Sequence, residues 1–233
     1  VFYFIAIKTI YKVVNVRFIM HTVVTKLISI QKEIQEKNTK TKIIAVSKTF
    51  PIEEIIPLID SGHKDFGENK IQEAVKKWTS IKKDFADINL HMIGKIQSNK
   101  VKFILPLFDY VHSLDSLKLA EKIFNEQKKY KKKIKIFIQV NIGDELQKAG
   151  VSPNEVKNFK NKCVEEFNLN IIGLMCLPPK NKIASIYFKE MNQLLIKTNL
   201  KELSMGMSND YIDAIDNNSS YVRIGSKIFG NRG

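Results

Sequence analysis

Short apolar runs alternate with longer amphipathic stretches along most of this 233-residue chain. The short runs have the length and the β-branched content of strands, and the longer stretches repeat apolar residues every three or four positions, as helices do. Strands are predicted at residues 43–47, 63–66, 90–93, 110–112, 134–141, 171–175, 202–205 and 221–224. Helices are predicted at residues 21–36, 52–61, 70–81, 115–130, 155–167 and 183–198.

This alternation predicts parallel pairing of the strands, because each parallel return needs a crossover of about a dozen or more residues. Eight strands are the number that closes a (β/α)8 barrel, so we predict one α/β domain, a TIM barrel, over residues 20–233. An open, doubly wound sheet is the alternative, and it normally carries a glycine-rich phosphate loop after its first strand. The segment Ser47-Lys48-Thr49-Phe50-Pro51 is not such a loop, which favours the barrel.

Residues 1–19 stand outside this pattern and are interpreted as an N-terminal extension. They are apolar and aromatic, contain no acidic residue, and include Lys8, Lys12 and Arg17. These charges interrupt the apolar run, so a membrane span is not predicted. The extension is either a targeting sequence, which leaves an organelle open as the location, or sequence upstream of a start at Met20.

The chain carries a formal charge of +14, which by itself would suggest a nucleic-acid partner. Arginine is the residue best suited to bidentate contacts with phosphates and guanine edges, and the chain has only Arg17, Arg223 and Arg232. A lysine-rich, arginine-poor composition is more typical of a bias in the coding sequence. We therefore predict neither a nucleic-acid partner nor a membrane partner.

The two cysteines and four histidines give no support for a metal site or a disulfide framework. Cys163 and Cys176 have neither the spacing of metal ligands nor the density of a disulfide-rich protein, so a reducing compartment, the cytoplasm, is predicted. The histidines form no close pair of the kind that binds zinc.

Candidate chemistry begins at the end of the first strand, since active sites of barrels lie at the carboxyl ends of the strands. Lys48 follows that strand on the same face as Ile44 and Val46, which is the interior face of a half-buried strand. A partly desolvated amine is a good nucleophile and can form a Schiff base with an aldehyde. The alternative is that Lys48 extends its amine to water at the mouth of the strand.

The ends of the seventh and eighth strands suggest an anion site. Ser204 with Gly206, and Gly225 with Ser226, offer hydroxyls and accessible backbone N–H groups where barrels often bind phosphate. Arg223 lies in the apolar eighth strand, where its guanidinium would meet an acceptor nitrogen or an anion, although a structural salt bridge is equally open. An amine, an anion site and an arginine are the parts that pyridoxal phosphate requires.

Five ordered motifs resemble those of the pyridoxal phosphate homeostasis protein family, also called proline synthetase co-transcribed proteins. They are Ile44-Ala45-Val46-Ser47-Lys48-Thr49; Phe66-Gly67-Glu68-Asn69 with Gln72-Glu73; His91-Met92-Ile93-Gly94 with Gln97-Ser98-Asn99-Lys100; Leu203-Ser204-Met205-Gly206-Met207-Ser208; and Val222-Arg223-Ile224-Gly225 with Ile228-Phe229-Gly230. The similarity runs from about Met20 to the last residue. Lys95 and Ile96 depart from the expected pattern, as do the residues before Met20.

The resemblance implies a barrel of the alanine racemase N-terminal type with pyridoxal 5'-phosphate held on Lys48 as a Schiff base. It further implies that Arg223 faces the pyridine nitrogen, that Ser204, Gly225 and Ser226 hold the phosphate, and that Asn69 lines the pocket. Because the chain ends at Gly233, we expect no second domain of the kind that racemases use. The family is identified with cofactor homeostasis, so we expect a monomeric carrier that supplies pyridoxal-phosphate-dependent apo-enzymes, with no catalytic and no metal-binding residue.

Two other functions stay open on the sequence alone. One is an enzyme, an amino-acid racemase or decarboxylase that uses the same Schiff base. The other is a lysine-rich nucleic-acid-binding protein, for which salt-dependent binding without a chromophore would be the sign.

Overall fold

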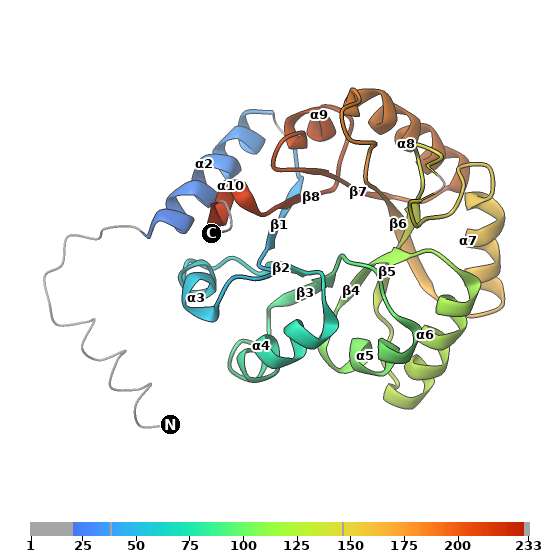
Figure 1. Ribbon diagram of the computed structural model, residues 1–233, viewed down its shortest axis with the longest axis horizontal. Helices are drawn as coiled ribbons and strands as arrows, with labels where there is room; N and C mark the ends of the chain where they lie inside the picture. Colours follow the sequence, from blue (N-terminus) through green and yellow to red (C-terminus); the bar gives the residue numbers. More distant parts are fainter. Residues whose placement is uncertain (1–20, 38, 146, 231–233) are drawn as a thin grey trace, which may run out of the picture.

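The structure, a computed structural model, describes residues 21–37, 39–145 and 147–230, so the predicted extension at residues 1–19 lies outside the described residues. Within these ranges eight parallel strands form one closed barrel in sequence order (Figure 1). They are β1 (Lys42–Val46), β2 (Asp65–Glu68), β3 (Asn89–Met92), β4 (Tyr110–Leu114), β5 (Lys135–Val140), β6 (Asn170–Cys176), β7 (Glu202–Met207) and β8 (Tyr221–Ile224). The ring closes because β1 pairs with β8, with Ile44 opposite Arg223. The predicted barrel is confirmed, and the open sheet is wrong.

The six predicted helices are present on the outside of the barrel. They are α2 (Thr22–Glu36), α3 (Ile52–Asp60), α4 (Ile71–Asp84), α6 (Leu117–Tyr130), α7 (Val156–Glu165) and α8 (Ala184–Thr198). The pattern does not predict four further elements in the described ranges: η1 (Ser98–Phe103), α5 (Ile104–Leu107), α9 (Tyr211–Asp216) and α10 (Ser226–Phe229). Each has only four to six residues, too few for a helical period to show in the sequence.

The strand limits differ from the prediction at two places that matter for the site. The second strand begins at Asp65, so His63 precedes it. The seventh strand continues to Met207, through Gly206, whose φ of +91° is a conformation that glycine adopts readily. The pairing of β7 with β8 changes register between Ser204 and Met207, so the usual alternation of side chains is interrupted there.

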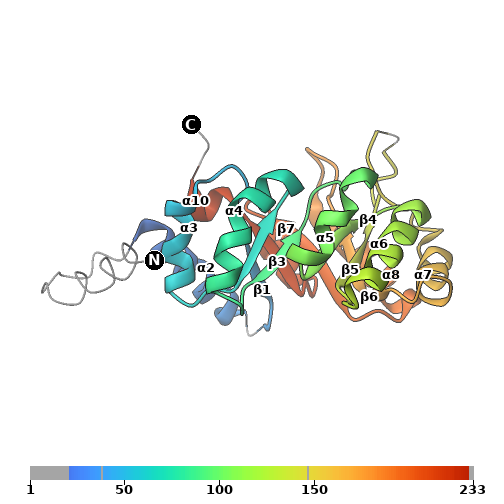
Figure 2. The same cartoon turned by 90° about the horizontal axis from the view of Figure 1, so that it is seen from below.

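The barrel has an apolar layer on each side of its sheet. Outside, the helices bury large side chains against the strands, including Phe66 and Trp78, which are fully buried. Figure 2 shows α4, α5 and α6 running alongside the strands on one wall. Inside, the lumen is filled by Ile44, Tyr110, Phe137, Met175 and Tyr221. Each such side chain contributes about 1.5–3 kcal/mol when it leaves water, so both layers hold the ring closed.

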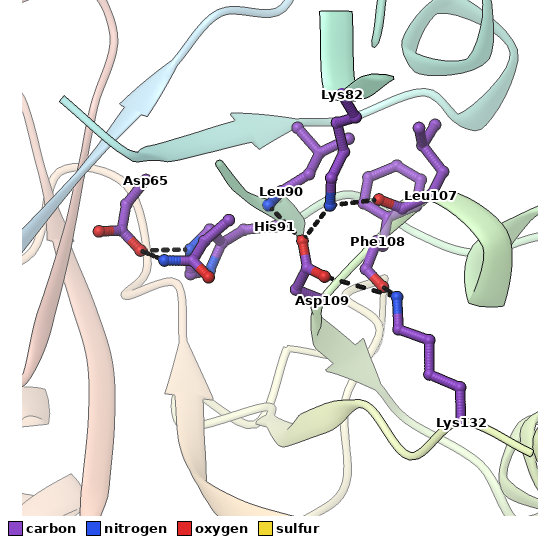
Figure 3. Close-up of polar contacts among 9 residues, drawn as sticks. Asp65, Lys82, Leu90, His91, Leu107, Phe108, Asp109 and Lys132 are labelled. Atoms are coloured by element: carbon purple, nitrogen blue, oxygen red, sulfur yellow. Dashed lines mark hydrogen bonds and ion pairs between the residues drawn. The ribbon is translucent and has the colours of Figure 1, made fainter. Parts of the chain in front are cut away.

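Charged side chains secure the amino-terminal end of the barrel (Figure 3). Asp109, just before β4, accepts hydrogen bonds from the backbone N–H of Leu90 at 2.9 Å and from Lys82 at 2.5 Å. Lys132 approaches the other carboxylate oxygen at 3.4 Å. One carboxylate therefore joins α4, β3 and the turn after α6, at the end of the barrel opposite the carboxyl ends of the strands.

Candidate functional site

A cavity of about 1080 Å³ opens at the carboxyl ends of the strands. Five of the seven residues predicted to contact a cofactor line it: Lys48, Asn69, Arg223, Gly225 and Ser226. The loops after β6 and β7 complete the wall with residues 177–184 and 207–210. The cavity thus occupies the position in which barrel proteins hold their ligands.

Lys48 is half-buried at the edge of this cavity, two residues after β1 ends. Its two neighbours in the chain are fixed by α4 and β2. The Ser47 hydroxyl donates to the Glu68 carboxylate at 2.8 Å, and the backbone N–H of Thr49 donates to Glu73 at 2.5 Å. Thr49 has a φ of +68°, an uncommon value for a β-branched residue, so the turn at Lys48 is held against its local preference.

Glu68, Glu73 and Lys77 form a cluster behind the turn, which we call the lysine clamp. Lys77 on α4 donates to the carbonyl oxygen of Ser47 at 2.8 Å and pairs with Glu68 at 3.0 Å and Glu73 at 3.2 Å. Glu68 is fully buried and also accepts a hydrogen bond from the Trp78 indole at 2.9 Å. A buried ion pair with these additional hydrogen bonds gives a single fixed geometry, and here it sets the backbone on both sides of Lys48.

Asn69 is positioned by close contact between the ends of β2 and β3. A Cβ atom at position 94 would lie 2.2 Å from the carbonyl oxygen of Asn69, so only glycine fits there. Gly94 thereby allows the Asn69 backbone to pass beside β3, with Asn69 at the cavity wall.

Arg223 lies almost fully buried at the inner end of the cavity, with 4% of its surface exposed. Its Nη1 donates to the carbonyl oxygen of Ser204 at 2.6 Å and to the Ser204 hydroxyl at 2.7 Å. Its Nη2 donates to the carbonyl oxygen of Cys176 at 2.9 Å. Burial lowers the pKa of the guanidinium, against smaller opposing effects of Cys176 and Asp210, but an arginine keeps its charge in proteins.

The other two predicted residues, Ser204 and Gly206, do not line the cavity. The Ser204 hydroxyl is fully buried and contacts Arg223 and His112 Nδ1, the latter at 2.9 Å. Gly206 lies against α9, where a Cβ atom would be 2.5 Å from the Ala214 methyl group. Ser204 therefore lies beside Arg223, to which it is hydrogen-bonded. Gly206 lies where β7 packs against α9.

Ser208 lines the cavity and was not predicted as a contact residue. Its hydroxyl accepts hydrogen bonds from the backbone N–H groups of Gly225 at 3.3 Å and Lys227 at 3.4 Å, which ties the loops after β7 and β8 together. The predicted strand ends two residues too early, at residue 205, and the family resemblance implied a phosphate contact for Ser204. The continuation of β7 through Gly206 moves the first polar loop residue to Ser208.

Residues outside the cavity complete this picture. Among the described residues no three histidine, cysteine, aspartate or glutamate side chains gather as metal ligands. No helix in the same ranges is long and apolar enough to cross a bilayer. Cys163 and Cys176 are free thiols, and burial raises the pKa of each to about 12.

The barrel agrees with the comparison to known families. A family model for the alanine racemase N-terminal domain matches residues 28–233. An alanine racemase structure from Clostridium difficile 630 has a TM-score of 0.71 at 15% identity, covering 91% of this chain and 57% of that one, which shows a shared fold. The protein is therefore a barrel of the alanine racemase N-terminal class.

Relatives of higher identity define the family within this class. A pyridoxal phosphate homeostasis protein from Pasteurella multocida (strain Pm70) is 35% identical over 228 residues, which cover 91% of this chain and 98% of that protein. The structure of PipY from Synechococcus elongatus PCC7942 with PLP bound has a TM-score of 0.79 at 29% identity, covering 89% of this chain and all of that one. The chain belongs to the pyridoxal phosphate homeostasis protein family.

Proposed function

We propose that this protein binds pyridoxal 5'-phosphate in the cavity at Lys48 and acts in the homeostasis of that cofactor as a carrier or buffer, without catalytic turnover. The observation that carries the proposal is the convergence of Lys48, Arg223 and the Gly225-Ser226 turn on one cavity. The names of the relatives and the PLP-bound structure of PipY support the choice of ligand.

The residues of the cavity suit each part of this cofactor. Pyridoxal phosphate presents an aldehyde, a pyridine nitrogen and a phosphate on a flat ring. Lys48 provides an amine for the aldehyde, and Arg223 provides a fixed donor for the ring nitrogen. Val46 and Ile93 provide apolar surface for the ring, and Ser226 a hydroxyl for the phosphate. The donor set therefore fits the group.

We assign the individual contacts as follows. When bound, the cofactor would supply an aldehyde, and the Lys48 amine would be the group that adds to it reversibly, with loss of water, to give a Schiff base. Gly225 and Ser226 hold the phosphate together with Ser208, since these residues meet at one side of the cavity. Asn69 lines the cavity beside the ring.

Ser204 and Gly206 act through other residues in this proposal. Ser204 holds the guanidinium of Arg223 by two hydrogen bonds, and Gly206 lets β7 pass α9 so that Ser208 reaches the cavity. This replaces the direct phosphate contacts that the sequence suggested for both.

The charge on Arg223 favours storage of the cofactor over turnover. A cationic donor beside the pyridine nitrogen disfavours protonation of that nitrogen, which makes the bound ring a weaker acceptor of electrons. Enzymes of the same fold accept such an arginine, so racemase or decarboxylase activity is the second candidate. We propose that a monomer operates in the cytoplasm, where its two free thiols stay reduced, and that apo-enzymes dependent on pyridoxal phosphate receive the cofactor.

The test is a titration of the purified protein with pyridoxal phosphate, followed by visible absorption and by borohydride reduction. We expect a Schiff-base band, and after reduction a stable adduct on the peptide that contains Lys48. Lys48→Ala should abolish both. Lys182→Ala removes another lysine that lines the same cavity and serves as the matched control, which should retain both.

Two outcomes would contradict the proposal. A protein that acquires no band at saturating cofactor does not bind it as described. A loaded protein that racemises or decarboxylates free amino acids is an enzyme and not a carrier.

A further inference from the structure

A continuous chain of hydrogen bonds crosses the interior of the barrel from the cavity to its amino-terminal end. We call it the lumen chain, and its members are Arg223, Ser204, His112, His91 and Asp65. The links measure 2.7 Å (Arg223 Nη1 to Ser204 Oγ), 2.9 Å (Ser204 Oγ to His112 Nδ1), 3.0 Å (His112 Nε2 to His91 Nδ1) and 3.0 Å (His91 Nε2 to Asp65 Oδ1). Figure 3 shows the last link, at the amino-terminal end.

The middle of the lumen chain is shielded by aromatic rings. His91 and His112 are fully buried. His91 stacks on Tyr110 with 4.1 Å between ring centroids, and His112 stacks on Phe137 at 4.3 Å. The ring of Tyr221 lies nearly perpendicular to that of His112, with 6.2 Å between the ring centroids. The rings therefore have one orientation, and buried groups of this kind are sensitive to the loss of any single partner.

The burial and the partners together fix the direction of every link. Burial lowers the pKa of both histidines, and for His112 the neighbouring charge of Arg223 acts in the same direction, so at neutral pH each ring is uncharged and carries one N–H. The Asp65 carboxylate can only accept, so His91 donates from Nε2 and accepts at Nδ1. His112 must then donate from Nε2 and accept at Nδ1, which leaves the Ser204 hydroxyl as its donor.

The two ends of the chain carry opposite charges. Arg223 is buried, and its hydrogen bonds within the described residues all go to uncharged oxygens, those of Ser204 and Cys176. A buried charge is costly unless dipoles or counter-charges compensate it. Asp210 at the cavity opposes part of this cost for Arg223, although burial still lowers the pKa of the guanidinium. In the lumen chain each donor points away from Arg223 and towards Asp65. Every acceptor lone pair in the chain therefore faces the arginine.

At the other end, Asp65 is the anion of the chain. Burial alone would raise the pKa of its carboxyl, but the hydrogen bond from His91, with smaller electrostatic contributions from nearby basic groups, outweighs that effect, so the pKa is lowered. Asn89 also donates to the same oxygen at 3.2 Å. The carboxylate therefore remains charged at neutral pH.

We propose that Asp65 and His91 are positioning residues for Arg223: through His112 they orient the Ser204 hydroxyl, hold the guanidinium at the cavity and supply a remote counter-charge. This inference deepens the proposed function, and its cofactor readout rests on that function. The NMR measurement described next does not rest on that function, because the positions of the protons on His91 and His112 can be observed in the protein without ligand.

The first test is heteronuclear NMR of isotopically labelled histidine in the unliganded protein. Both His91 and His112 should carry their proton on Nε2. In Asp65→Leu, which removes the acceptor, the proton of both rings should move toward Nδ1, although His112 lies two links away. Asp65→Asn retains an acceptor oxygen and should preserve both tautomers. If the leucine variant does not fold, the wild-type tautomers still decide the question, since Nδ1–H on either ring overturns the proposal.

The second test is the titration with pyridoxal phosphate. Asp65→Asn removes the negative charge but keeps the chain, and we expect about fivefold weaker binding, a typical coupling between distant groups. His63→Gln is the control, because His63 contacts the Asp65 backbone oxygen at 2.9 Å and is not part of the chain; its affinity should equal that of wild type. Unchanged affinity in Asp65→Asn overturns the counter-charge role. If wild type binds no cofactor, the proposed function fails, while the NMR result still judges the chain.

Discussion

The amine of Lys77 lies 2.8 Å from the carbonyl oxygen of Ser47 and donates a hydrogen bond to it. A helix on the outside of the barrel is thereby joined to the residue that precedes Lys48. The same amine pairs at 3.0 Å with Glu68, which is fully buried. The backbone position of Lys48 thus depends on a side chain that does not line the cavity.

Lys77→Met should destabilise the protein and weaken cofactor binding. The change leaves the Glu68 carboxylate buried without its cation, a loss of about 3–5 kcal/mol in comparable pairs. Unfolding in urea measures it, and the pyridoxal phosphate titration reports the looser Lys48 turn. Lys76→Met, on the exposed face of the same helix, is the control and should change the free energy of unfolding by no more than about 0.5 kcal/mol. Equal stability of the two variants would refute the lysine clamp.

Alanine substitutions at two glycines with the same φ can distinguish the cost of backbone strain from the cost of steric overlap. Gly62 and Gly206 both have a φ of +91°, but a Cβ atom would meet nothing within 4 Å at Gly62 and would lie 2.5 Å from Ala214 at Gly206. Gly62→Ala should lose about 1 kcal/mol from backbone strain alone. Gly206→Ala should lose about 2 kcal/mol more, because α9 must shift. Urea unfolding of both variants checks the difference, and similar losses would show that α9 adjusts freely.

The buried histidines make stability depend on pH below neutrality. Burial lowers the pKa of His91 and of His112 in the folded protein, whereas in the unfolded chain each has a pKa of about 6.5. Below that value the unfolded chain takes up protons that the folded protein excludes. Stability is therefore complete above about pH 6.5 and falls as the pH is lowered towards the folded-state values.

Between pH 7.5 and pH 5.5 we expect a loss of about 1–3 kcal/mol from the two rings together, most of it from His112, whose pKa is lowered the more. Urea unfolding at both pH values measures it. His21→Gln alters an exposed histidine and should keep the same pH dependence. A free energy of unfolding that is constant over this range would mean that both rings bind protons as readily in the folded protein as in the unfolded chain, and would contradict the prediction.

Asp109→Ala should destabilise the amino-terminal end of the barrel. The variant removes the acceptor of the Leu90 backbone N–H and the partner of Lys82, both visible in Figure 3. Loss of a part-buried acceptor of this kind amounts to about 1–3 kcal/mol. Asp87→Ala breaks an exposed pair with Lys64 and should have no measurable effect on the melting temperature. Two identical melting curves would contradict the role of Asp109.

The eight strands and their parallel order could be predicted because the signals are local. Apolar runs of strand length, separated by stretches long enough to cross over, leave few other arrangements. The first and last strands contributed Lys48 and Arg223 correctly to one cavity, since their ends must adjoin in a closed ring.

The parts of the site that could not be predicted depend on non-local geometry. The side-chain direction of Ser204 follows from a change of register beside Gly206, which breaks the two-residue period on which the assignment relied. Lys77 is one lysine in a lysine-rich chain, and only the packing of α4 brings it to Ser47. His91 and His112 are far apart from Ser204 in the sequence, so no spacing rule connects them.

The pairing of β1 with β8 also bears on the order in which the parts of the cavity form during synthesis of the chain. Lys48 follows the first strand and Arg223 belongs to the last, so a nascent chain contains the lysine well before the arginine is synthesised. An incomplete barrel has the lysine but no closed cavity around it. If the cavity binds its ligand as proposed, only a chain that has paired its first strand with its last would present the complete site.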